Sequence, residues 1–237
     1  MKIFPAVHYS MGGMWVDYNQ MTNIPGLFAA GECEYQYHGA NRLGANSLVS
    51  AIYGGMVAGP KAVEYIRGLK KSAEDVSPAI FEQNRKAQEQ KYEGLLALNG
   101  TENAYVLHKE LGEWMTDNMT VVRYNTKLEA TIGKIKELKQ RYKNININDT
   151  SRWNNAGAAF TRQLWNMLEL AEAMTLGALM RNESRGAHYK PDFPTRNDEE
   201  FMKTTKATWT PDGPQISYDA VDVSLIPPRI RDYSKDK

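Results

Sequence analysis

Residues 77–180 carry helical periodicity almost without a break, and this stretch limits the folds open to the chain more than any other feature. Ser77 followed by Pro78 is a typical helix start, because serine caps free amide groups and proline fits the first helical turn. The same reasoning predicts helices over 77–98, from a Thr101 cap to 118, over 128–142 and over 153–180. Apolar residues lie three or four positions apart in 128–142, and 153–180 is apolar over much of its circumference, so we expect a bundle of three or four helices with the last one at its centre.

The region before the helices has a different composition. Residues 1–69 are rich in glycine and small residues, and the apolar piece 26–30 is expected to form a buried strand. A helix capped by Asn46 or Ser47 should then run to about Leu69, with Pro60 bending or interrupting it. This composition is typical of a binding site in which backbone approaches a ligand closely.

The region after the helices indicates a small amount of β structure. Residues 201–209 and 215–223 alternate loosely around Thr-Pro-Asp-Gly-Pro, which predicts a hairpin, and a charged tail with two prolines follows from 226. The sequence therefore divides into 1–69, 70–190 and 191–237. The fold class expected is mainly α with some β.

The overall composition excludes several functions. The 29 basic and 28 acidic residues give a net charge of +1, which is too small to attract nucleic acid. The single cysteine, Cys33, excludes an intrachain disulfide and a cysteine-built metal or iron–sulfur site, and it fits a reducing, cytoplasmic compartment. No apolar run approaches the roughly 20 residues of a membrane span, so we expect any membrane association to come through a partner.

Two groups of residues have the composition of a binding site. His8 stands beside Gly12 and Gly13, whose lack of side chains would let a planar ligand approach, although a histidine that merely satisfies a turn is the alternative. Glu32 follows an apolar segment that ends at a glycine, where a carboxylate suits sugar-like hydroxyls, and a solvated loop carboxylate is its alternative.

Residues 38–48, His-Gly-Ala-Asn-Arg-Leu-Gly-Ala-Asn-Ser-Leu, form the most specific motif. Arg42 offers a planar fork that binds a carboxylate through two hydrogen bonds and stays charged. The helix that starts near Ser47 points free amide groups and the positive end of its dipole towards an anion. Packing alone does not explain this combination.

Taken in order, these motifs resemble the flavoprotein family of succinate dehydrogenase and fumarate reductase. The motifs are His-Tyr-Ser-Met-Gly-Gly at 8–13, Gly-Leu-Phe-Ala-Ala-Gly-Glu at 26–32 and the 38–48 motif. The resemblance continues through Asn-Glu-Ser-Arg-Gly-Ala-His-Tyr at 182–189 and Asp-Phe-Pro at 192–194, so it covers most of the chain. Aspartate oxidases share much of the pattern.

The resemblance implies a fold and a set of roles. Residues 1–69 would be the C-terminal half of a FAD-binding α/β domain with the end of a capping domain, followed by a helical bundle and a β-hairpin with its tail. His8 and Arg42 would bind the carboxylates of succinate or fumarate. Glu32 would contact the ribityl or nearby hydroxyls of FAD, and Ser47 and Leu48 would meet the isoalloxazine edge.

The resemblance also implies a reaction and partners. In the family, hydride passes between the dicarboxylate and FAD, and electrons continue to an iron–sulfur subunit and to quinone through a membrane anchor. The protein would then lie in the cytoplasm, peripheral on the inner face of the cell membrane. The family's Gly-rich dinucleotide turn, its flavin-linked histidine and its proton-shuttling arginine have no counterpart in these residues, so we expect the chain alone to be incomplete and inactive.

Other interpretations remain open at the level of sequence. The chain could belong to an aspartate-oxidase-like flavoenzyme, or it could be a helical interaction module without catalysis. Arg185 and His188 are expected to brace the helical region against the flavin region rather than to bind a ligand.

Overall fold

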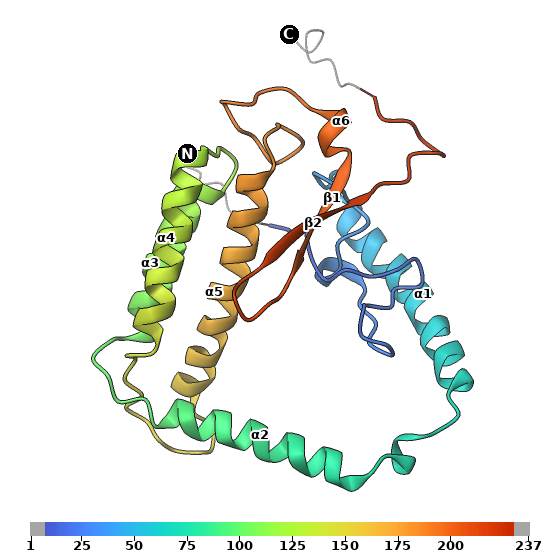
Figure 1. Cartoon of the computed structure of the whole chain (residues 1–237). Coiled ribbons are helices and arrows are strands. Elements are labelled where there is room, and N and C mark those ends of the chain that lie inside the picture. Colours follow the sequence, from blue (N-terminus) through green and yellow to red (C-terminus); the bar gives the residue numbers. More distant parts are fainter. Residues whose placement is uncertain (1–7, 230–237) are drawn as a thin grey trace.

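The computed structural model describes residues 8–229. Figure 1 shows a helix and loops from the first part of the chain on one side, a helical bundle on the other, and one long helix joining them. A two-stranded hairpin lies along the bundle, between it and the N-terminal loops. The predicted mixture of mainly α with some β is confirmed.

Three helices make the bundle: α3 (Ala104–Met119), α4 (Asn125–Tyr142) and α5 (Ala156–Met180). Their apolar faces meet in one core, in which several side chains are completely removed from solvent: Leu107, Ile135, Leu138, Leu164 and Leu168. Burial of a side chain of this size contributes roughly 1.5–3 kcal/mol each. The apolar residues that recur every three or four positions are therefore the ones that face the core.

The helix α2 (Pro78–Leu96) begins as predicted but does not join the bundle core. The Ser77 hydroxyl accepts from the amide of Ala79, and Pro78 occupies the first turn. No residue of α2 is buried, and in Figure 1 the helix runs along the bottom of the picture from the side of α1 to the lower end of the bundle. Only its last turn reaches the core, through Leu96. The bundle thus has three helices rather than four.

The helix α3 starts later than expected because Thr101 is engaged elsewhere. Asn103 caps α3 by accepting from the amide of Tyr105, whereas the Thr101 hydroxyl accepts from Asn144. Main-chain hydrogen bonds join the two connections beside it, from Gly100 to Ile145 and from Glu102 to Asn144. This pairing between loops, which sequence periodicity does not encode, displaces the cap by two residues.

In the first part of the chain, α1 (Asn46–Gly68) is the long element and the loops around it are irregular. Pro60 lies inside α1, and the helix continues through it to Gly68; Pro60 and Met56, one turn earlier, are both exposed residues. The strand expected at 26–30 does not form within the described residues. Phe28 makes only an isolated bridge with Met21, and a short turn of 3₁₀ helix, η1 (Gly31–Cys33), follows. A buried strand needs partners on both edges, and the described residues supply one bridge.

The hairpin forms as predicted with slightly shorter strands. β1 (Lys203–Thr208) and β2 (Gln215–Ala220) pair in antiparallel register from Lys203 opposite Ala220 to Thr208 opposite Gln215. It packs on α5, where Gly177 leaves room for the Thr205 methyl group, and the four-residue helix α6 (Asp198–Phe201) precedes it. Across residues 8–229, none of the helices combines the length and apolar character that crossing a bilayer requires.

Replacing Leu168 by alanine should destabilise the bundle by about 2–5 kcal/mol, because the fully buried side chain leaves a cavity in the core. Leu170 lies two residues further along α5 and is 64% exposed, so Leu170→Ala should change the free energy of unfolding by less than about 0.5 kcal/mol. Urea unfolding followed by circular dichroism at a helical wavelength measures both. Equal losses in the two variants would contradict the assigned core face.

Candidate functional site

A cavity of about 230 Å³ brings together residues from three separate segments. It is lined by His8 and Tyr9, by Glu32, and by Ser47, Leu48 and Ala51 of α1. Four of the five residues predicted to bind substrate or cofactor therefore lie around one cavity, and the fifth, Arg42, does not line it. Tyr9 and Ala51 line the same cavity and carry no sequence signal of their own beyond their neighbours.

Glu32 is placed by short contacts between the first two segments. Its Oε1 accepts from the amide of Ser10 at 2.9 Å, and the amide of Met14 donates to the carbonyl of Cys33 at 2.7 Å. Gly13 makes this approach possible, since a Cβ there would lie 2.5 Å from the Cys33 carbonyl oxygen. The sharp turn into η1 requires Gly31, whose φ is +81°. Glu32 remains exposed, with carboxylate oxygen available to a ligand.

Arg42 does not line the cavity but stacks on a residue that does. Its guanidinium carbon lies 5.1 Å from the centre of the Tyr9 ring, a cation–π contact. Nη1 donates to the carbonyl of Leu43 at 3.2 Å, while the buried Nε has no partner among the described residues. Arg42 thus keeps most of its donors available beside the cavity.

The first turn of α1 borders the cavity without a side-chain cap. The residue before the helix is Ala45, in the left-handed conformation with φ +64°, and neither Asn46 nor Ser47 caps the helix as expected. The Ser50 hydroxyl donates to the Ser47 carbonyl and lies 3.0 Å from Nε2 of His38. The amide of Asn46 donates to the carbonyl of Leu43 at 3.3 Å, and no side chain caps the amide groups that follow it in the first turn, which can therefore meet an anion.

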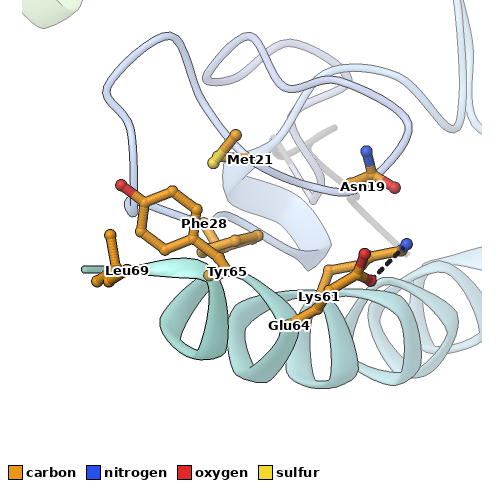
Figure 2. Close-up of a pocket in the computed structure, with 8 residues that line it drawn as sticks. Asn19, Met21, Phe28, Lys61, Glu64, Tyr65 and Leu69 are labelled. Atoms are coloured by element: carbon orange, nitrogen blue, oxygen red, sulfur yellow. Dashed lines mark hydrogen bonds and ion pairs between the residues drawn. The ribbon is translucent and has the colours of Figure 1, made fainter.

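A second cavity, of about 340 Å³, lies farther along α1 and contains none of the predicted site residues. Figure 2 shows Phe28, Tyr65 and Leu69 at one end and the Lys61–Glu64 ion pair, 2.8 Å long, at the other. The cavity is open to the surface, and the two charged residues in its lining, Lys61 and Glu64, are paired with each other. Its lining does not indicate a chemical function.

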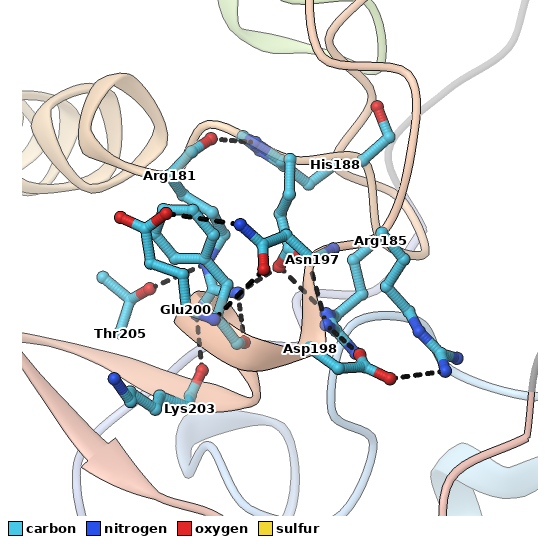
Figure 3. Close-up of polar contacts among 12 residues, drawn as sticks. Arg181, Arg185, His188, Asn197, Asp198, Glu200, Lys203 and Thr205 are labelled. Atoms are coloured by element: carbon cyan, nitrogen blue, oxygen red, sulfur yellow. Dashed lines mark hydrogen bonds and ion pairs between the residues drawn. The ribbon is translucent and has the colours of Figure 1, made fainter.

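The connection after α5 is organised by a carboxylate that is completely buried. Glu183 accepts from Arg181 at 2.5 Å, from Arg185 at 2.9 Å and from the amide of Asn197 at 2.9 Å. Burial raises the pKa of Glu183, and the hydrogen bonds from Arg185, Asn197 and Arg181 outweigh it, so the pKa lies below the ordinary value. Figure 3 shows the network extending from Arg185 to Asp198, at 2.7 Å.

Within this connection, residues 185–188 form a tight turn that contacts the loop preceding Arg42. Arg185 and His188 exchange main-chain hydrogen bonds of 2.8 and 3.0 Å. At the tip of the turn, the amide of Ala187 donates to the carbonyl of Ala40 at 3.0 Å. The contact that braces the helical region against the N-terminal region is thus a main-chain hydrogen bond at the tip of the turn. Arg185 and His188, the two residues that the sequence predicts to brace these regions, stand on either side of it.

His188 itself joins two helix ends. Nε2 donates to the carbonyl of Arg181 at 2.9 Å, and Nδ1 accepts from Arg123 at 2.5 Å, so the ring is held in its neutral form. Burial, and then the charge of Arg123, lower the pKa of His188 to about 4. The histidine therefore serves as a structural hydrogen-bonding group at neutral pH.

Next to His188, the half-buried Arg123 and the buried Lys190 make no carboxylate contact among residues 8–229. Arg123 donates to the carbonyls of Met119 and Thr120 at the carboxyl end of α3, and Lys190 donates to the carbonyl of Leu179 near the carboxyl end of α5. These helix ends carry partial negative charge. Burial still lowers the pKa of Arg123 to about 10 and, with the charge of Arg123, that of Lys190 to about 8.

Comparison with known proteins places this geometry in a family. The family described as fumarate reductase flavoprotein C-term matches residues 108–233, more than half of the chain. This chain belongs to the fumarate reductase flavoprotein C-terminal family. A second family, described as a FAD binding domain, matches residues 1–48 and so includes the loop that carries Arg42.

The relatives of this family member are longer proteins. It is 66% identical to the succinate dehydrogenase flavoprotein subunit of Bacillus subtilis over all of its own length and 41% of that protein, and 37% identical to the fumarate reductase flavoprotein subunit of Escherichia coli over 98% of its length and 39% of that protein. The chain thus spans about two fifths of the relatives it matches.

Solved structures give the same result. An Escherichia coli quinol fumarate reductase chain superposes with a TM-score of 0.87 at 36% identity, over 94% of this family member and 38% of that chain. Sdh1 of Mycobacterium smegmatis superposes with a TM-score of 0.77 at 31% identity, over 94% and 36%. An adenylylsulfate reductase of Archaeoglobus fulgidus, with a TM-score of 0.66 at 18% identity, shares the fold over 87% and 33%.

Lowering the pH from 6.5 towards 4 should reduce the free energy of unfolding of the chain. The unfolded chain takes up a proton on His188 near its ordinary pKa of 6.5, whereas the folded chain does so only near 4. Stability therefore rises with pH between these values, by at most about 1.4 kcal/mol per pH unit from this group. Denaturant unfolding at pH 6.5, 5.5 and 4.5 measures the slope.

The variant His188→Gln keeps an amide that can donate to Arg181 and a carbonyl that can accept from Arg123, but it cannot titrate. It should have a shallower slope than the parent. His108→Gln, on the exposed side of α3, should retain the parent's slope. An unchanged slope in His188→Gln would show that other groups cause the acid destabilisation.

Proposed function

We propose that this chain forms the C-terminal part of a flavoprotein subunit that interconverts succinate and fumarate by hydride transfer to or from FAD. One observation carries the proposal: His8, Glu32, Ser47 and Leu48 meet around one cavity, with Arg42 stacked on its wall. Membership of the fumarate reductase flavoprotein C-terminal family, and 66% identity to a succinate dehydrogenase flavoprotein subunit, support it.

The residues around the cavity fit FAD. The uncapped first turn of α1, with Ser47 and Leu48, offers amide groups and a positive dipole to the electron-rich edge of a flavin. The exposed carboxylate of Glu32 can accept hydrogen bonds from the ribityl hydroxyls. The chemistry that FAD supplies when bound is hydride exchange with a dicarboxylate. We assign Glu32, Ser47 and Leu48 to the cofactor.

We assign the two carboxylates of the substrate to His8 and Arg42. An arginine guanidinium offers paired donors to a carboxylate. Tyr9 stacks on the guanidinium of Arg42, and of its two terminal nitrogens Nη1 donates to Leu43, which leaves Nη2 to donate to a ligand. His8, which immediately precedes Tyr9 in the sequence, lines the cavity and can donate to the second carboxylate.

The partners proposed for the full protein are an iron–sulfur subunit and a membrane anchor. The structural relatives are named as a quinol fumarate reductase with menaquinol molecules and as Sdh1 in complex with UQ1. A subunit of this kind would be peripheral on the inner, cytoplasmic face of the cell membrane. We place its functional division at 1–69, 70–190 and 191–237, and we expect the chain by itself to be inactive.

Two alternatives receive less support. An aspartate-oxidase-like enzyme would share the flavin contacts, but the curated relatives described above are succinate dehydrogenase and fumarate reductase subunits. A helical module without catalysis would not need His8 and Glu32 to meet an uncapped helix start at one cavity, with Arg42 stacked on Tyr9 beside it. The geometry therefore favours the dicarboxylate enzyme.

Arg42→Lys should raise the succinate KM and lower kcat/KM by on the order of tenfold to a hundredfold while leaving FAD content unchanged. Lysine keeps the charge but loses the paired hydrogen bonds, which are worth roughly 1.5–3 kcal/mol when charge-assisted. A hybrid in which this chain replaces the matching segment of the Bacillus subtilis subunit, assembled into its complex, provides the holoenzyme. Succinate kinetics and FAD absorbance are measured on the same samples.

Arg67→Lys is the matched control, because Arg67 is exposed in the last turn of α1, away from the cavity. Its kinetics should equal those of the parent hybrid. Succinate kinetics in Arg42→Lys that match the parent would refute the substrate role of Arg42.

A further inference from the structure

We infer that Gly186 is a positioning residue for Arg42: the 185–188 turn fixes the main chain at Ala40 and thereby the place of the guanidinium. The inference rests on the proposed role of Arg42 in binding a substrate carboxylate. By this inference the 185–188 turn, in the C-terminal part of the chain, influences the affinity for dicarboxylates through Ala40 and Arg42.

The contact between the turn and the loop leaves no room for a side chain. A Cβ on Gly186 would lie 2.4 Å from the carbonyl oxygen of Ala40, 2.6 Å from its carbonyl carbon and 2.8 Å from its Cβ. All three atoms belong to the main chain or are fixed to it, so no rotamer change relieves the overlap. The φ of +58° at Gly186 also favours glycine. Any larger residue must displace Ala40, the turn, or both.

The loop 39–45 depends on this contact for its position. Within residues 8–229, its one main-chain hydrogen bond to another segment is the 3.0 Å bond from the amide of Ala187 to the carbonyl of Ala40. Arg42 follows two residues later and donates only to its own neighbour, Leu43. The guanidinium also stacks on Tyr9, but this contact does not fix the main chain of the loop, so displacement of Ala40 is transmitted along the loop to Arg42.

The turn, in contrast, is rigidly held from behind. Arg185 donates to Glu183, which is completely buried, and to Asp198, which also accepts from Arg196. The paired main-chain hydrogen bonds between Arg185 and His188 close the turn. When a Cβ is added at Gly186, the weakly held loop is the partner that moves.

The test is the affinity of the assembled hybrid complex for malonate, a dicarboxylate, measured by isothermal titration calorimetry in parallel with succinate kinetics. Gly186→Ala should raise the malonate Kd and the succinate KM by about tenfold or more, since a displacement near 1 Å at a positioned group has effects of that size. FAD content and kcat should change by less than about twofold. A structural defect alone would lower FAD content and kcat together.

Two glycine variants control for other effects of the substitution. Gly213→Ala also places alanine at positive φ, +116°, but its Cβ meets only the Glu172 carboxylate at 3.7 Å, and Gly133→Ala adds a methyl group to open space on α4. Both should keep the parent's malonate Kd. The double variant Gly186→Ala/Arg42→Lys should have the same malonate Kd as Arg42→Lys alone, because both changes act through the contact between residue 42 and the ligand carboxylate.

The outcomes separate the two proposals. If Gly186→Ala has the parent's malonate Kd while Arg42→Lys has a higher one, only the positioning role of Gly186 is overturned. If both variants have the parent's malonate Kd, the assignment of Arg42 itself is overturned. If Gly186→Ala does not assemble, Asp198→Asn, which loosens the hold on Arg185, should raise the malonate Kd severalfold with FAD retained. A parental Kd in that variant would equally overturn the inference.

Discussion

The buried carboxylate of Glu183 is the interaction on which the arrangement of the other parts depends. An ionised carboxylate removed from water is costly unless every oxygen is satisfied. Here two arginines and a main-chain amide satisfy it, and they come from the end of α5, from the 185–188 turn and from the residue that caps α6. One charge thus joins the bundle, the turn and the start of the hairpin.

The carboxyl ends of the bundle helices reinforce the same junction. Arg123, His188 and Lys190 satisfy main-chain carbonyls at the ends of α3 and α5, where an unpaired carbonyl would otherwise be buried. The junction has few ways to relax, because each cation already uses its donors locally. A rigid bundle end is therefore available as a support for the loop at Ala40. The candidate substrate site lies at the far end of this support.

The helices could be predicted from sequence because their signals are local. Apolar spacing located the core face of α4, an apolar character over most of its circumference located α5, and Ser77 with Pro78 located the start of α2. The failures arise where distant residues decide the result. The Asn144 side chain engages Thr101, which then does not cap α3. The helix α2 has the predicted cap at Ser77, but it has no buried residue and reaches the core only through Leu96 at its end.

The candidate site divides in the same way. His8, Glu32, Ser47 and Leu48 could be selected because their motifs are dense in charge, glycine and amide groups, and they meet at one cavity. The left-handed Ala45 before α1 has no residue-level signal, since alanine does not favour that conformation. The contact of Gly186 with Ala40 was also invisible. A glycine in a sequence indicates conformational freedom, but it does not indicate which distant segment packs where a side chain would otherwise lie.

The most direct measurement is a structure of the assembled hybrid complex with malonate bound. A malonate carboxylate should lie at charge-assisted hydrogen-bond distance, about 2.7–2.9 Å, from the Arg42 guanidinium. The amide of Ala187 should still donate to the carbonyl of Ala40. Malonate bound away from Arg42, or a loop separated from the 185–188 turn while malonate is held, would contradict it.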